Sequence, residues 1–440
     1  MSQVAERLLP VGAHLARYVA DYQAAKSPSQ PQWLSKAREA ALAGFERLGF
    51  PSTKLEEWRF TPIGPIAGKP FALAADGFAK ADKHLTSALS AGGPLAVSVN
   101  GRFAPHLSSL DALPKGLQVL SLEAALAANP ALVEPYLTRL ASPEQQAFTA
   151  LNTAFLRDGV VIFIAPHTVV ETPVEVLFVS VAEGKPTVSH PRFLVVAGES
   201  SQVRILERYV GSGTTFTNAI TEVVLGANAV IDHYKVQEES SAGFHIAGMY
   251  LHGARSGTFS SHSLAFGGAI VRNDVVAVLD GEGIDCTLNG LYLAGGKQLI
   301  DNHTTIDHAR PHCGSHEVYK GILMDQAHAV FNGKIVVRID AQKTDAKQTN
   351  KALLLSDDAA INTKPQLEIF ANDVKCTHGA AIGQLDDDAV FYLRSRGLSL
   401  EDARAMLIHA FASDILNRLK IPSVREHLEA ALTARLPQSV

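Results

Sequence analysis

The feature that most constrains this chain is a regular period in its strand-rich middle. Turns of small residues that lead into a new strand recur there at intervals of 28, 28 and 27 residues. They begin at Gly198, Gly226, Ala254 and Gly281. Similar segments then recur at intervals of 30 residues, beginning at Ala329, Ala359 and Ala389. One coil of a solenoid cannot bury its apolar face alone and must stack on its neighbours, so a steady period of this kind predicts a β-helix-like core.

A large sandwich built from evenly spaced hairpins is the alternative interpretation. Asn-Gly pairs favour tight hairpin turns, and two such pairs occur in the region, at Asn289-Gly290 and Asn332-Gly333. They are too few for a hairpin architecture of this length, and the periodicity favours the solenoid.

The regions on either side have a different texture. Residues 1–155 are rich in Ala and Leu with charges at helical intervals, and we predict a mixed, mostly helical region. It contains one short hairpin signal at Asn100-Gly101. Residues 156–396 form the predicted β-helix core, and residues 397–440 form a second helical region.

Two N-terminal capping motifs are expected in this last region. Ser399 with Asp402 is the first, and Ser423 with Glu426 is the second. After Ser399 the apolar residues follow an i, i+3, i+4 stripe that includes Met406, Leu407 and Phe411. One face of this helix must therefore pack on the core or on a partner.

Composition excludes several classes of protein. With 39 Lys and Arg against 44 Asp and Glu, there is no basic excess to neutralise a phosphate backbone, so we expect no nucleic-acid partner. The three cysteines build no disulfide framework and are expected to be free thiols. No secretory leader and no apolar run of membrane-spanning length is visible, so we expect a cytoplasmic location and no membrane partner.

Signatures of catalysis are also missing. The nearest candidate for a phosphate-binding loop, A-G-G-K-Q around Lys297, lacks the earlier glycine and the hydroxyl residue that such a loop needs. Any nucleotide must then be bound by another chain. Hydrolase, zinc protease and dithiol motifs do not occur, so each of these activities lacks its signature in the sequence.

Cys376 and His378 are the most suggestive pair of residues. At positions i and i+2 of an extended strand they share one face and can converge on one ligand. A neighbouring imidazolium would also favour the thiolate, which is the form that binds metal. A buried cysteine beside a hydrogen-bonded histidine is the competing interpretation, and two ligands fill at most half of a tetrahedral site.

A second group of ligand-type residues is less ordered. It comprises His303, His308, His312, Cys313, His316 and His328. In a strand-rich coil their irregular spacing sends them to different faces, so half-buried polar positions are the favoured interpretation. A metal-dependent β-helix enzyme that uses the cluster from His303 to His316 is the alternative, and the sequence leaves the metal open.

Longer stretches of the sequence resemble a known family. They are I-D-A-Q-K-T-D-A-K-Q-T-N-K, I-F-A-N-D-V-K-C-T-H-G-A-A-I-G-Q-L-D and, near the start, P-S-T-K-L-E-E-W-R-F-T-P. The chain resembles the SufB/SufD family of iron–sulfur cluster assembly scaffolds from about residue 160 to its end. Leu393 stands where SufB proteins have a cysteine, which favours the branch that pairs with SufB.

The resemblance implies a right-handed parallel β-helix between helical regions. It also implies a scaffold that is not itself an enzyme, a SufB-like sister subunit, and a SufC-like ATPase bound through the C-terminal helices. The sequence leaves open whether a homodimer forms when the sister is absent. His378, and with less weight Cys376, correspond to the family segment at the interface between sister subunits, where a transient iron–sulfur cluster is built. Met406, Leu407 and Phe411 are then the expected contacts for the ATPase.

Overall fold

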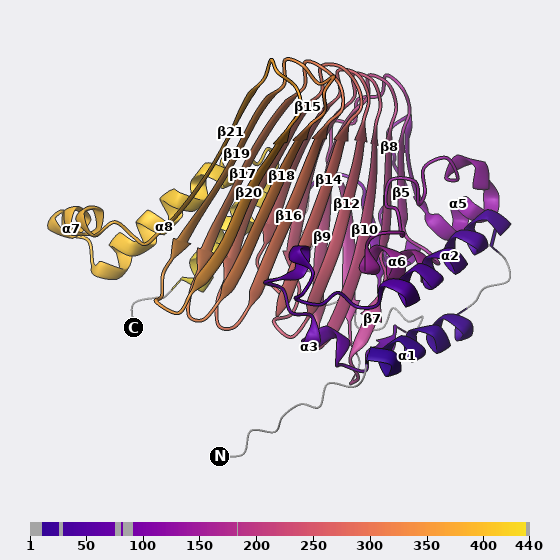
Figure 1. Ribbon diagram of the computed structural model, residues 1–440, viewed down its shortest axis with the longest axis horizontal. Coiled ribbons are helices and arrows are strands. Elements are labelled where there is room, and N and C mark those ends of the chain that lie inside the picture. The colour runs from indigo at the N-terminus through magenta and orange to yellow at the C-terminus, as the bar shows by residue number, and fades with distance from the viewer. Residues whose placement is uncertain (1–10, 26–29, 75–80, 82–90, 183, 437–440) are drawn as a thin grey trace.

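The computed structural model describes residues 11–25, 30–74, 81, 91–182 and 184–436. Two long sheets face each other and run the length of the molecule (Figure 1). The N-terminal helices lie at one end of this stack, and strand β21 (Lys375–Gly383) lies at the other. Within the described part of the chain, no helix is both long and apolar enough to span a membrane.

The chain alternates between the two sheets as it advances. The first sheet has the order β20 (Ala360–Ile369), β18 (His328–Val337), β16 (Leu299–His308), β14 (Ile270–Leu279), β12 (Phe244–Gly253), β10 (Thr215–Leu225), β8 (Arg192–Ala197), β5 (Val160–Ile164) and β4 (Leu117–Ser121). In addition, β7 (Thr187–Ser189) pairs with β10, and β1 (Ala72–Leu73) pairs with β7. The second has the order β21, β19 (Asp345–Leu354), β17 (Gly314–Leu323), β15 (Asp285–Ala294), β13 (Thr258–Ala265), β11 (Val230–Glu238), β9 (Gln202–Ser212), β6 (Val174–Val181), β2 (Leu95–Val99) and β3 (Arg102–Phe103).

Strand register confirms the parallel β-helix. Val230 pairs with Gln202 on one side and with Thr258 on the other, so each of these coils takes 28 residues. Every described pairing between consecutive coils is parallel, and the two antiparallel pairs, β2 with β3 and β4 with β5, lie at the N-terminal end. The hairpin alternative is wrong, because Asn289 and Gly290 lie in the middle of β15.

One expected repeat is also wrong. Ala389 heads no strand, since it lies in helix α7 (Asp387–Ser395), while Ala359 immediately precedes β20. The side chain of Asp386 caps this helix by accepting hydrogen bonds from the backbone N–H groups of Asp388 and Ala389. The acidic turn thus ends the solenoid where the period alone would have continued it.

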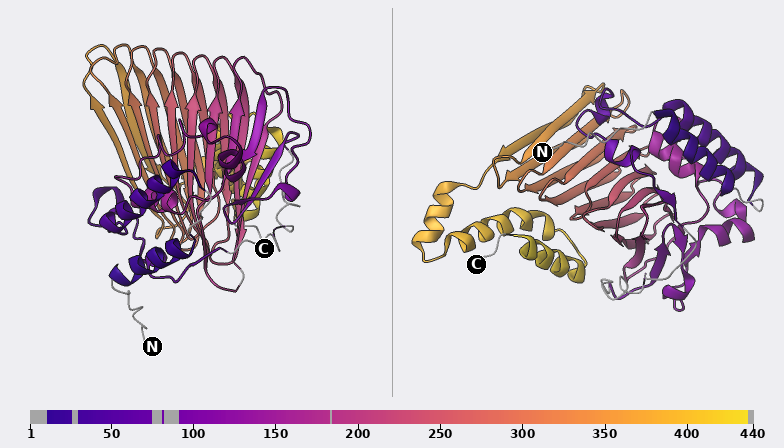
Figure 2. Two further views of the ribbon diagram at one scale, coloured as in Figure 1. Left: turned by 90° about the vertical axis from the view of Figure 1, so that its right-hand side faces the viewer. Right: turned by 90° about the horizontal axis from the view of Figure 1, so that it is seen from below.

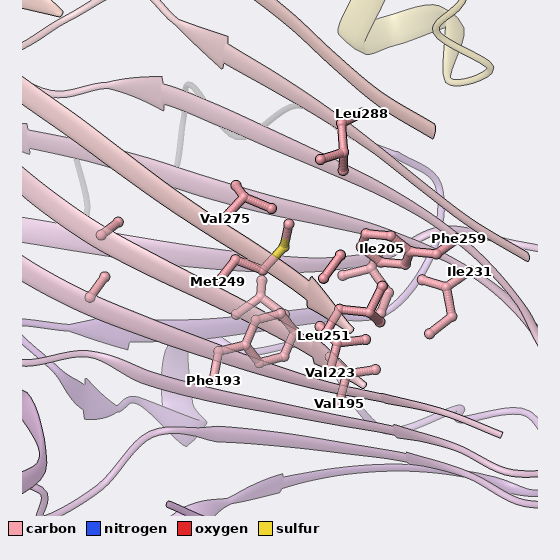
Figure 3. Close-up of a cluster of buried hydrophobic side chains, with 14 of the residues drawn as sticks. Phe193, Val195, Ile205, Val223, Ile231, Met249, Leu251, Phe259, Val275 and Leu288 are labelled. Carbon is pink, nitrogen blue, oxygen red and sulfur yellow. The ribbon is translucent and has the colours of Figure 1, made fainter. Parts of the chain in front are cut away.

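A cluster of buried apolar side chains runs between the sheets, and buried polar residues such as Glu207 and His233 share the interior with it. Figure 3 shows this interior, where Phe193 and Val223 from the first sheet meet Ile205 and Phe259 from the second. Each of these four side chains is fully buried. Because alternate residues of a strand point to opposite faces, the inward positions of every coil form columns along the interior.

The N-terminal region supplies helices that pack on the outer face of the first sheet. They are α1 (Val11–Ala24), α2 (Gln32–Leu48), α3 (Gly64–Ala67), α5 (Leu122–Ala128) and α6 (Ala147–Ala154), with short 3-10 turns η1 (Glu56–Trp58) and η3 (Pro130–Leu132). A further 3-10 turn, η2 (Pro105–Leu107), packs on the second sheet instead. Phe148 packs there against Phe216 of β10, with 5.9 Å between the ring centroids, and Phe45 belongs to the same buried cluster. The hairpin at Asn100 and Gly101 is confirmed, with both residues at positive φ between β2 and β3.

The C-terminal helices cover the outer face of the second sheet (Figure 2). Helix α8 (Leu400–Leu416) buries Ile408, Ala412 and Ile415 against that sheet, and α9 (Pro422–Arg435) follows it. The cap at Ser399 is confirmed, since its Oγ accepts a hydrogen bond from the N–H of Asp402. The second capping motif is wrong, because α9 begins at Pro422 and Ser423 lies inside the helix.

Candidate functional site

Cys376 and His378 lie on β21, the last strand of the second sheet. Its one described neighbour is β19, on which Ala346 pairs with Cys376 and Gln348 pairs with His378. Both side chains occupy inward positions, as Cys376 packs against Ile335 and Ala346 at the end of the interior. The prediction that they share a face is therefore confirmed. That face points to the interior at the open end of the stack, which we call the mouth of the β-helix.

The two side chains differ in exposure. Cys376 is half-buried and His378 is exposed, like the rest of β21. Burial raises the pKa of the Cys376 thiol, and Asp345 raises it further, while a backbone hydrogen bond from Ala346 opposes both. The expectation that the neighbouring histidine would favour the thiolate is thus wrong, and His378 is the more available ligand.

Beneath His378 a polar column continues inward through successive coils. Gln348 Nε2 donates a 2.7 Å hydrogen bond to Glu317 Oε2, and both side chains are buried. Burial raises the pKa of Glu317 to about 7, against the opposing hydrogen bonds from Thr304 and Gln348. Gln348 and Glu317 were missed in the sequence, although counting back one and two coils from His378 would have found them.

The histidine-rich stretch forms no metal site. His303 faces outward from β16, whereas the ring of His308 lies 2.9 Å from Ser315 Oγ and that of His328 lies 2.6 Å from Asn362 Oδ1. The thiol of Cys313 donates to the carbonyl of Gly281. Among the described residues, no group of three or more His, Cys, Asp or Glu side chains is arranged to hold a metal ion. The structure therefore gives no support to a metal-dependent enzyme that uses these histidines.

His303 instead holds the N-terminal segment on the β-helix. Its Nδ1 lies 3.2 Å from Glu57 Oε2 and its Nε2 lies 3.1 Å from Asp301 Oδ1. Burial lowers the pKa of His303, but the charge of Asp301 and hydrogen bonds to both carboxylates outweigh it and raise the value to about 9. Trp58 of the same segment covers the guanidinium of Arg272 at 3.9 Å.

A groove of about 530 Å³ opens beside this segment, far along the chain from Cys376. Its charged residues are already paired, with Arg272 bound to Asp274 at 2.8 Å and to Asp301 at 2.7 Å. The groove therefore adds no ligand to the pair on β21, and its chemistry serves to clamp the N-terminal segment.

The expected ATPase contacts lie on α8 in different environments. The side chain of Met406 is 49% exposed, and Leu407 is half-buried. Phe411 packs on the cluster under the helix, with the ammonium of Lys320 at 4.6 Å from its ring. Helix α7 exposes two large aromatic side chains, Phe391 at 74% and Tyr392 at 55%. The sequence analysis missed them because it assigned this segment to a further strand of the repeat.

Comparison with known proteins agrees with this architecture. The family model described as "SUF system FeS cluster assembly, SufBD core domain" matches residues 178–411, and that of the SufBD protein N-terminal region matches residues 14–176. The chain belongs to the SufBD family. This SufBD-family chain is 31% identical to the iron-sulfur cluster assembly protein SufD of Escherichia coli over 395 residues, covering 89% of this chain and 90% of that protein.

Other relatives of the SufBD-family chain are similar over nearly their full length. An iron-sulfur cluster assembly SufBD family protein of Synechocystis is 33% identical, with 94% of this chain and 93% of that protein covered. SufD of Bacillus subtilis is 27% identical, with 92% and 95% covered. The expected resemblance is confirmed, and the protein is a SufD homologue in a family of iron–sulfur cluster assembly proteins.

Proposed function

We propose that this chain is the SufD-type scaffold subunit of a SUF assembly complex. It pairs with a SufB-like sister, binds a SufC-like ATPase, and has no turnover of its own. The single observation that carries the proposal is the open end of the β-helix, where β21 exposes His378 beside half-buried Cys376. A long exposed edge strand is a template for pairing with another chain.

Hydrogen-bonding directions favour β21 as the pairing edge. The N–H of Lys375 donates to Thr344 beneath it, so the N–H groups of Cys376, His378 and Ala380 point to the open side. On β20 the N–H of Ala360 donates toward the stack, which places the missing donor of Pro365 on the open side. Proline blunts the edge of β20, and β21 retains its donors.

At this edge the cluster is cargo that two chains hold together. His378 offers an imidazole nitrogen that suits iron, and Cys376 offers a thiol whose raised pKa makes it the weaker candidate. Two side chains supply at most half of a ligand set, so the sister subunit provides the remainder. Its own strand, added beside β21, would bring its ligands within reach of His378.

The ATPase docks on the C-terminal helices. Helix α7 projects beyond the end of the sheets (Figure 2) and exposes Phe391 and Tyr392, while α8, which packs on the second sheet, exposes Met406. Exposed aromatic residues and methionine are enriched at interfaces between proteins. Because these helices follow β21 directly, movement of the ATPase subunits would be transmitted to the strand that bears His378.

The test is His378→Ala in the complex co-expressed with the SufB-like and SufC-like chains. We expect normal recovery of the complex and loss of most of its iron and sulfide. Thr377→Ala is the matched control, because Thr377 lies on the same strand but faces outward. A His378→Ala complex with the same iron and sulfide content as the Thr377→Ala complex would contradict the role of His378.

A further inference from the structure

The side chain of Gln348 is fixed between two coils in an unusual way. It pairs in register with Glu317 on one side and with His378 on the other, and all three occupy inward positions. Adjacent strands lie about 4.8 Å apart, so these side chains stack directly above one another. Gln348 is fully buried, whereas His378 above it is exposed.

The orientation of the Gln348 amide is set from below. Its Nε2 donates to Glu317 Oε2 at 2.7 Å, and the planar amide then turns Oε1 away from Glu317, toward the coil of His378. Gln348 Oε1 is buried and accepts no hydrogen bond from the described residues. A buried acceptor without a donor is costly, so an acceptor held at this place calls for a donor.

The position of Gln348 depends on a glycine across the interior. A Cβ added at Gly333 would lie 2.2 Å from Gln348 Nε2 and 2.9 Å from its Oε1. Gly333 sits in β18 and its φ is not positive, so it is there for the close approach of Gln348 and not for a special backbone conformation.

We propose that Gln348, anchored on Glu317, accepts a hydrogen bond from the His378 imidazole and so orients this ring at the mouth of the β-helix. A ligating histidine commonly donates its second N–H to an oxygen acceptor, which fixes the tautomer and leaves the other nitrogen for the metal. Gln348 is thus a positioning residue. The inference rests on the proposed function only for its consequence, since this hydrogen bond would form whether or not a cluster is bound.

The experiment measures the tautomer of His378 in the full chain by long-range ¹H–¹⁵N correlation at pH 8, with His378→Ala to assign its signals. Gln348→Leu removes the acceptor, and Gly333→Ala displaces it while retaining it. Both should change the tautomer ratio about five-fold, as expected for one hydrogen bond of ordinary net strength. Asn350→Leu is the control, because Asn350 is the next inward residue of β19 and pairs with Ala380.

An unchanged ratio in folded Gln348→Leu and Gly333→Ala would overturn the inference, and so would an equal change in Asn350→Leu. The proposed function is tested separately by iron content in the co-expressed complex. If Gln348→Leu shifts the tautomer while His378→Ala keeps its iron, then the orientation stands and the cluster role of His378 falls. If the tautomer is unmoved while His378→Ala loses iron, the reverse holds.

Discussion

At the scale of single residues, buried polar contacts decide which histidines are available for chemistry. His303 and His308 are the sort of residues that suggest a metal site in a sequence, yet one is held by two carboxylates and the other by Ser315. His378 has an exposed ring on an edge strand. Availability, and not residue type, therefore separates the candidate ligand from the structural histidines.

His303→Gln should alter stability in a pH-dependent way. The folded pKa of about 9 lies above the ordinary value of 6.5, so the protonated ring stabilises the fold fully below pH 6.5 and loses that effect as the pH rises through 9. The wild type should therefore lose at most about 3 kcal/mol more than His303→Gln between pH 6 and pH 9.5. Urea unfolding at the two pH values measures this difference.

His252→Gln is a suitable control for this comparison, because that histidine pairs with Asp280 at an exposed position. It should follow the wild type at both pH values. Equal pH dependence in the wild type and His303→Gln would show that the clamp on the N-terminal segment does not depend on the charge of His303.

At the scale of elements, helix ends are set by specific capping contacts that similar sequences do not always make. Ser399 and Ser423 both precede acidic residues by three positions, but only Ser399 caps a helix. Pro422 already occupies the first position of α9, where proline is favoured, and this shifts Ser423 one place inside.

Ser399→Ala should therefore destabilise the C-terminal helices by about 1 kcal/mol, whereas Ser423→Ala should cost no more than a few tenths. Thermal or urea unfolding of the two variants gives the comparison. Equal losses in the two variants would contradict the assignment of Ser399 as the only cap of the pair.

The exposed residues of α7 and α8 allow the contributions of the two helices to the proposed ATPase contact to be measured separately. Phe391→Ala with Tyr392→Ala should weaken binding of a SufC-like ATPase at least ten-fold, because exposed aromatic anchors carry much of an interface's energy. Met406→Ala with Leu407→Ala should weaken it less. Phe411→Ala would also disturb the packing under α8 and is a poorer probe.

Pull-down with the tagged ATPase measures these effects, and Glu429→Ala on the exposed side of α9 is the control. Undiminished recovery of the Phe391 and Tyr392 variant would move the contact away from α7. A loss confined to the Met406 and Leu407 variant would place it on α8, as the sequence stripe suggested.

At the scale of the whole molecule, the solenoid is closed at one end and open at the other. N-terminal helices and antiparallel strands cover the first coils, while β20 and β21 expose the last one (Figure 1). Repeat architectures need such caps for solubility, and the proposed sister subunit would supply one at this end.

Ala380→Pro should block pairing at this end without unfolding the chain. The N–H of Ala380 points to the open side, so its loss removes a donor to the sister subunit and none to β19. We expect recovery of the SufB-like chain in co-purification to fall at least ten-fold, with Ala380→Val as the control that keeps the N–H. Full recovery with Ala380→Pro would exclude strand addition at β21.

The sequence by itself determined the period, the helical ends, the free thiols and the shared face of Cys376 and His378. These are local properties: intervals between turns, i to i+2 alternation, and spacing within one helix. The register of β9, β11 and β13 follows the spacing of the turns at Gly198, Gly226 and Ala254.

Only the tertiary structure decided what surrounds His378. Gln348 and Glu317 lie 30 and 61 positions before it, and their contact arises because successive coils stack in register. The exposure of β21 also depends on where the solenoid stops, because no described strand follows it in the stack. The solenoid ends where Asp386 caps helix α7. Local capping competes there with the stacking of another coil, and the period alone does not predict which of the two prevails.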